Sequence, residues 1–81
     1  MWVKSQNGMK LVNCEAFICA TSPINCAIYE LYGYTSGGTM IFLGNFSDEE
    51  ASKRIINALT MRAERVLLTN DKLGVFNIPI I

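Results

Sequence analysis

The stretch that decides the fold is TMIFLGNFSDEEASKRIINAL, residues 39–59, because it passes from a strand pattern into a helix pattern. Its first eight residues are expected to form a strand, and Gly44 within them predicts a bulge or a close backbone approach. Ser47 and Glu50 match a capping box, in which each side chain reaches the other residue's backbone amide. Apolar residues then recur at helical spacing and predict an amphipathic helix to about Glu64. They are Ala51, Ile55, Ala58 and Leu59.

The other expected elements are strands. Asn7-Gly8 is a strong signal for a two-residue hairpin turn, because both central positions of that turn need a positive φ. The expected strands are 2–5, 10–20, 25–34, 39–46 and 75–78, with turns at 35–38 and 70–72. The pattern predicts one α+β domain over residues 1–81, an antiparallel β-meander of about four strands plus a short C-terminal strand, packed on one amphipathic helix. Residues 65–69 fit either a continued helix or a strand.

Apolar side chains occupy both faces of the expected strand 10–20. Leu11, Phe17 and Cys19 fall on one side, whereas Val12, Cys14, Ala16 and Ile18 fall on the other. One helix covers only one face of a sheet, and a large exposed apolar surface usually marks an interface. We therefore expect a homodimer or higher homo-oligomer. The alternative is that residues 76–81 fold back over the second face.

Composition argues against several classes of function. The chain has seven Lys and Arg against seven Asp and Glu, so its formal net charge is zero. Nucleic-acid binding and adhesion to anionic membranes both depend on cationic surfaces, so neither is expected. The first residues turn polar too soon for a signal peptide, and the apolar runs are too short to span a bilayer. These features predict a cytoplasmic location.

Catalytic patterns are lacking in the sequence. There is no histidine, which removes imidazole catalysis and the commonest metal ligand, and no nucleotide-binding or zinc-protease motif occurs. Cys14, Cys19 and Cys26 form no CxxC pair, and we expect buried apolar thiols rather than a disulfide or a metal site. A paired-carboxylate site formed by Glu15 and Glu30 is geometrically possible, but no other feature of the sequence supports it. We predict that the protein is not an enzyme and holds no cofactor or metal.

Two groups of residues are candidates for binding. The tyrosines before the glycine turn at 35–38 would offer aromatic faces and hydroxyls to a small planar ligand. Two arginines near the helix end would complete the site if several copies of the chain assembled. The candidate ligand-binding set is Tyr32, Tyr34, Thr35, Ser36, Arg62 and Arg65. The ordinary alternative is a hairpin with tyrosines at its edge and arginines that offset the helix dipole. The candidate partner-binding set is the apolar tail, Phe76, Ile78, Ile80 and Ile81.

Three segments carry a resemblance to other proteins: MWVKSQNG (residues 1–8), KLVN (residues 10–13) and LGNFSDEE (residues 43–50). These segments resemble short uncharacterised proteins of Firmicutes and their phages, which open with Met-Trp-(Val/Ile)-(Lys/Arg)-Ser-Gln. The likeness spans roughly the first two-thirds of the chain in two patches, and residues 60–81 depart from the usual pattern. The resemblance implies a phage or prophage context and supplies no activity.

Three functions are consistent with these observations. The first is a non-catalytic binding protein, phage- or prophage-encoded, that contacts a host protein through its uncharged sheet and apolar tail, for instance in an anti-defence role. The second is an oligomeric protein that sequesters a small nucleotide-like signal. The third is a minor structural protein.

Overall fold

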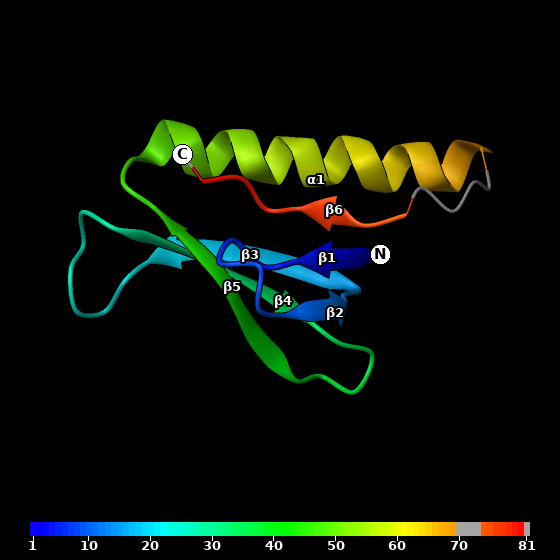
Figure 1. Cartoon of the computed structure of the whole chain (residues 1–81). Helices are drawn as coiled ribbons and strands as arrows, with labels where there is room; N and C mark the ends of the chain where they lie inside the picture. The colour runs from blue at the N-terminus through cyan, green and yellow to red at the C-terminus, as the bar shows by residue number, and fades with distance from the viewer. Residues whose placement is uncertain (70–73, 81) are drawn as a thin grey trace.

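The computed structural model describes residues 1–69 and 74–80, with side chains described for residues 1–65 and 74–80. Its elements are β1 (Trp2–Lys4), β2 (Leu11–Asn13), β3 (Ala16–Thr21), β4 (Tyr29–Tyr34), β5 (Met40–Phe46), α1 (Glu49–Thr69) and β6 (Phe76–Asn77). One helix packs on strands, which confirms the α+β class. The strands form two three-stranded sheets, ordered β2-β1-β6 and β3-β4-β5, and Figure 1 shows α1 lying as one layer along them.

The expected strand 10–20 is broken, and the two sheets separate at the break. The Cys14 amide donates to the Met1 carbonyl in the first sheet, whereas the Glu15 amide donates to the Tyr34 carbonyl in the second. The backbone therefore passes from hydrogen bonding in the first sheet to hydrogen bonding in the second between two consecutive residues. The single meander predicted from sequence is wrong in this respect. Only β3, β4 and β5 form one, while β1 and β2 form a separate antiparallel hairpin.

The hairpin turn is longer than predicted. Ser5 donates its amide to the Lys10 carbonyl, which leaves a four-residue loop in place of the expected two-residue turn. Gly8 has a φ of 76° there, a conformation that favours glycine. The Asn7 side-chain oxygen accepts from the Ser5 hydroxyl and from the Met9 amide, so side chains complete the turn. This local network explains why a longer loop forms.

Both predictions for Gly44 are confirmed. The register steps from the pair Leu31 and Gly44 to the pair Tyr32 and Phe42, so Leu43 is the extra residue of a β-bulge. The backbone of the first hairpin also approaches here, since the Gln6 amide donates to the Leu43 carbonyl at 2.7 Å. The bulge thus joins the first sheet to an edge of the second.

The helix begins one residue later than the capping-box prediction places it. Asp48, and not Ser47, is the N-cap, because its Oδ1 accepts the Ala51 amide at 2.7 Å. The helix continues to Thr69, so the backbone at 65–69 is helical. The predicted turn at 70–72 lies outside the described residues.

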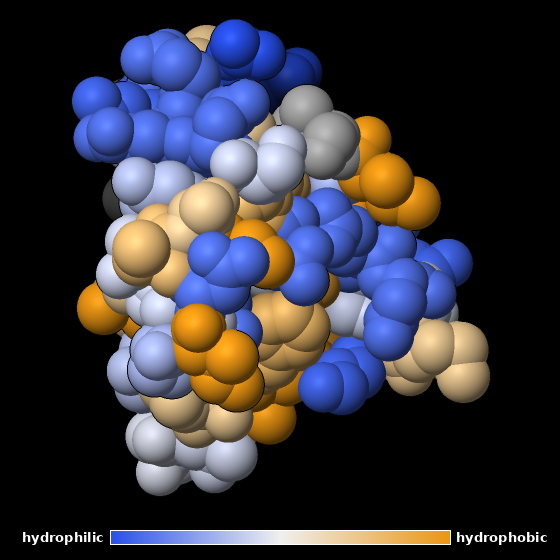
Figure 2. Space-filling model, turned by 90° about the vertical axis from the view of Figure 1, so that its left-hand side faces the viewer, coloured by the Kyte–Doolittle hydropathy of each residue, from blue (hydrophilic) through white to orange (hydrophobic). Residues whose placement is uncertain are grey.

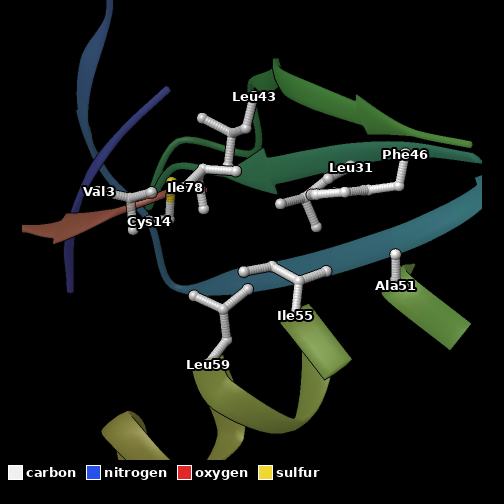
Figure 3. Packing of buried hydrophobic residues seen from close by; sticks show 9 residues of the cluster. All are labelled: Val3, Cys14, Leu31, Leu43, Phe46, Ala51, Ile55, Leu59 and Ile78. Atoms are coloured by element: carbon white, nitrogen blue, oxygen red, sulfur yellow. The ribbon is translucent and has the colours of Figure 1, made fainter. Parts of the chain in front are cut away.

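The core lies between α1 and both sheets. Figure 3 shows Ile55 and Leu59 of the helix directed toward side chains of the strands, with Val3 near Ile78 at one end. The complete buried set is Val3, Cys14, Leu31, Leu43, Phe46, Ala51, Ile55, Leu59 and Ile78. The helical stripe predicted from sequence is therefore confirmed for Ala51, Ile55 and Leu59, whereas Ala58 is half-buried.

The tail joins the first sheet. β6 pairs in parallel with β1, with Val3 opposite Phe76, and the Ile78 amide donates to the Lys4 carbonyl. The tail thus folds back, but onto an edge of the first sheet. Within the described chain, no helix is both long enough and apolar enough to cross a membrane.

Candidate functional site

The main candidate surface is the face of β3-β4-β5 that points away from α1, which we call the outer face. Its apolar and aromatic members are Ala16, Ile18, Tyr32, Tyr34, Met40 and Phe42. They alternate along the strands with the buried residues that face the helix, such as Leu31. Ile18, Phe42 and Met40 are exposed by 46%, 36% and 53% respectively. An apolar face of this kind remains open to solvent in the single chain.

Cross-strand contacts give the outer face a fixed shape. Ile18, Tyr32 and Phe42 form one row across the three strands, and the rings of Tyr32 and Phe42 meet edge to face with centroids 5.5 Å apart. The next row contains Tyr34 and Met40, whose hydroxyl and sulfur lie 3.2 Å apart. Edge-to-face pairs of this geometry stabilise a sheet surface beyond their burial alone.

Charge is confined to the margins of the outer face. The Tyr32 hydroxyl donates to Glu30 Oε1 at 3.0 Å. This hydrogen bond to a carboxylate, with smaller effects of burial and of the Glu30 charge, raises the pKa of Tyr32. Lys10 Nζ lies 6.0 Å from the centroid of the Phe42 ring and 3.4 Å from the Phe42 carbonyl oxygen. A carboxylate and an ammonium therefore flank an apolar centre.

The glycine turn beside the tyrosines is held by its own hydrogen bonds. The Thr35 amide donates to the Thr39 carbonyl, and the Thr39 amide donates back to the Thr35 hydroxyl at 3.3 Å. Gly38 has a φ of 82°. Thr35 thus already accepts a hydrogen bond within the turn, whereas Ser36 is exposed.

The structure separates the predicted ligand-binding set into two groups. Tyr32 and Tyr34 share the outer face, as strand alternation predicts. Arg62 lies on α1, on the other side of that sheet, with its guanidinium 5.8 Å from the centroid of the Phe76 ring. Arg65 follows on the same helix. A ligand held by both groups would therefore require more than one copy of the chain.

The predicted partner-binding tail is mostly occupied within the fold. Phe76 is half-buried and Ile78 is only 4% exposed, because both belong to the packing around β1. Ile80 is 85% exposed. Ile81 lies outside the described residues. Of the described members, Ile80 alone presents most of its side chain to solvent.

The described part of the chain bears on the sequence expectations for metal ligands, paired carboxylates and thiols. No group of three or more Cys, Asp or Glu residues there is placed to hold a metal ion. Glu15 precedes β3, and Glu30 pairs with Ala20 at the far end of it, so the two carboxylates do not meet. Cys14 is buried and Cys19 half-buried, but Cys26 is exposed, which corrects the prediction of three buried thiols.

A cavity of about 570 Å³ between α1 and the start of β3 was not predicted from sequence. It lies where the chain passes from the first sheet to the second at Cys14–Glu15. The helix has 21 residues and is about 31 Å long, whereas β3 has six and is about 20 Å long. The sequence carried no signal for this cavity, because it predicts a continuous strand 10–20 and a helix that ends at about Glu64.

Comparison of the chain with protein-family models, with curated proteins and with solved structures found no match to any of them.

Proposed function

We propose that this protein is a non-catalytic binding protein that acts by protein–protein contact through its outer face. The observation that supports this proposal is an exposed apolar and aromatic row, Ile18, Tyr32 and Phe42, with charged groups only at its margins. Protein interfaces typically have an apolar, aromatic centre and a polar rim. Large exposed apolar patches on soluble domains commonly mark such interfaces.

The proposed partner is a protein of a host cell, with the chain encoded by a phage or prophage. The sequence resemblance supports this context, and the neutral formal charge of the chain fits a contact made by apolar burial. Tyr32 and Phe42 would be its central anchors, because aromatic residues are enriched in binding hot spots. Blocking a host defence component is one form that this activity would take.

The second proposal is an oligomeric protein that sequesters a small planar ligand. The observation that favours it is the common face of Tyr32 and Tyr34, which offers two aromatic rings beside the turn at 35–38. Because Arg62 and Arg65 lie on the other side of the sheet, this function needs an assembly in which copies supply different parts of one site. The third function, a minor structural protein, is not supported by any specific contact.

Native mass spectrometry of the protein isolated from its source cells separates these proposals. We expect a complex with a second polypeptide that is lost in Phe42→Glu, because a charge would be buried at the centre of the contact. Met61→Glu is the matched control, since Met61 is 68% exposed on the helix and should retain the partner. A complex that survives Phe42→Glu would refute the outer face as the contact. A homo-oligomer that releases a small molecule on denaturation would support sequestration instead.

Figure 2 shows how hydropathy is distributed over one end of the molecule. It views the molecule from the end at which the helix begins, and hydrophilic side chains gather over that end of α1. Lower down, over the strands and their loops, hydrophobic and hydrophilic side chains are interspersed. The choice of Met61 as the control rests on its own 68% exposure, since it lies farther along α1 than the end seen in this view.

A further inference from the structure

We infer that the cavity between α1 and the start of β3 is a binding site for a small amphiphilic cation, such as a primary alkylamine. The inference goes beyond the proposed protein contact, because this cavity is lined mainly by α1 and the start of β3, and among the described residues it shares only Ala16 with the outer face. Its volume of about 570 Å³ is within the range of small-molecule sites.

The walls of the cavity suit an apolar chain. Ile56, Leu59 and Ala63 follow one another at helical spacing and line one side, and Phe17 lines the other. Cys14 is 2% exposed and Leu59 is 3% exposed, whereas Ala16, Thr60 and Ala63 are exposed, so the site is an open hollow with a buried floor. An alkyl chain placed there would exchange contact with water for contact with carbon and sulfur atoms, which is favourable in proportion to its buried area.

The mouth of the cavity suits a positive charge. Glu15 and Glu64 both line the cavity and both are exposed, so their carboxylates stand where the wall meets solvent. Among the described residues, neither carboxylate has an ion pair or a side-chain hydrogen bond. No Lys or Arg side chain of the described chain lines the cavity.

One cationic group does lie beside the site. The amino group of Met1 donates to Asn13 Oδ1 and to the Cys14 carbonyl, each at 3.0 Å. Two of its N–H groups are thus already used within the first sheet. Both acceptors are neutral, so the ammonium keeps its charge, and the two carboxylates of Glu15 and Glu64 exceed it by one negative charge. This balance favours a cation over an anion or a neutral head group.

The test compares three probes that share an eight-carbon chain: octylammonium, octanoate and 1-octanol. Each is titrated into the ¹⁵N-labelled full chain below its aggregation limit. We expect saturable binding with octylammonium about tenfold tighter than octanoate, since each exposed carboxylate contributes a modest charge interaction. The shifted amides should include Phe17, Leu59 and Ala63, which surround the cavity.

Variants assign the effect to individual groups. Glu15→Gln with Glu64→Gln should remove most of the preference for octylammonium and leave the affinity for 1-octanol unchanged. Glu50→Gln is the matched control, because Glu50 is an exposed helix residue that does not line the cavity. Ala63→Leu should weaken all three probes, because it fills the cavity from an exposed helix position that tolerates leucine.

The inference is overturned if octanoate binds as tightly as octylammonium or if the double Glu variant keeps the full preference. It is equally overturned if the shifted amides lie on the outer face, or if none of the three probes binds saturably.

Discussion

Gln6 and Gly44 are in such close contact that a Cβ atom added to Gly44 would lie 2.8 Å from the Gln6 Cβ. The amide group of the same glutamine accepts from the Asn45 amide at 3.1 Å and donates to the Asn45 and Pro79 carbonyls at 3.0 Å each. One side chain of the first hairpin therefore connects the bulged edge of β5 with the tail. This gives Gln6 of the opening motif a structural role.

Gly44→Ala should destabilise the protein by about 1–3 kcal/mol, because the added methyl group would overlap Gln6 and force the hairpin and β5 apart. Urea unfolding followed by circular dichroism measures the change. Gly37→Ala is the control, since the only neighbour of an added Cβ there is the Thr35 hydroxyl oxygen at 3.9 Å. Equal midpoints for the two variants would show that the hairpin does not press on Gly44 in solution.

Gln6→Leu should cost about 1–2 kcal/mol. It keeps a side chain of similar size but loses three hydrogen bonds, and the exposed backbone groups left behind can bind water instead. Hydrogen exchange should accelerate at the amides of Asn45 and Ile78. Asn57→Leu, on the exposed side of the helix, controls for a polar-to-apolar change. Unchanged exchange at both amides would contradict the linking role of Gln6.

Asp48→Ala should lower the free energy of unfolding by about 1 kcal/mol, because it removes the acceptor for the Ala51 amide in the first helical turn. Ser47→Ala should change it by only a few tenths of a kcal/mol. Thermal melting monitored at a helix-sensitive wavelength distinguishes them. The reverse order would restore Ser47 as the cap.

The three thiols should react with iodoacetamide in an order set by their surroundings. Cys26 is exposed and should react first, Cys19 is half-buried, and Cys14 is buried and should react last. Burial also raises the pKa of both Cys14 and Cys19, which lowers the thiolate available for attack. Mass spectrometry of partially labelled protein gives the order, and unfolding in urea should abolish it. Early labelling of Cys14 in the folded chain would disprove its burial.

Cys14 and Cys19 predict lower stability in alkaline solution. Their pKa values are raised on folding above the ordinary value of 9.0, so the folded chain retains these protons where the unfolded chain loses them. Their contribution is therefore complete below pH 9.0 and is lost as the pH rises through the raised values. The urea midpoint should fall between about pH 8 and about pH 10, and Cys19→Ala should reduce that fall. An unchanged fall in the variant would exclude Cys19 as its source.

Local signals predicted some features of the fold, but they misplaced the turn at Asn7-Gly8 and the helix cap at Ser47. The helical stripe of Ala51, Ile55 and Leu59 was predicted because burial follows helical spacing, and Gly44 because a bulge needs a residue that tolerates close approach. The strand break at Cys14–Glu15 was missed because that segment is uniformly compatible with a strand. The break is decided by two carbonyls that are distant in sequence: the Met1 carbonyl accepts from the Cys14 amide, and the Tyr34 carbonyl accepts from the Glu15 amide.

The candidate sites also contain features that the local sequence pattern predicted and features that it did not. Strand alternation placed Tyr32 and Tyr34 on one face, and the structure confirms it. It carried no information on Arg62, which belongs to another layer, or on Ile78, whose burial depends on pairing with β1. The helix-side cavity was missed for a related reason, since its walls come from α1 and from the segment at Cys14–Glu15 where the chain changes sheets.

The parallel pairing of β1 with β6 has a consequence for synthesis of the chain. Val3 reaches its partner Phe76 only after the ribosome has added all the residues between them, which takes roughly 4–15 s at typical rates of translation. During that interval the nascent hairpin presents an unpaired strand edge to other chains and to chaperones. Premature termination before residue 76 would leave that edge permanently open, so truncated products should aggregate or be degraded.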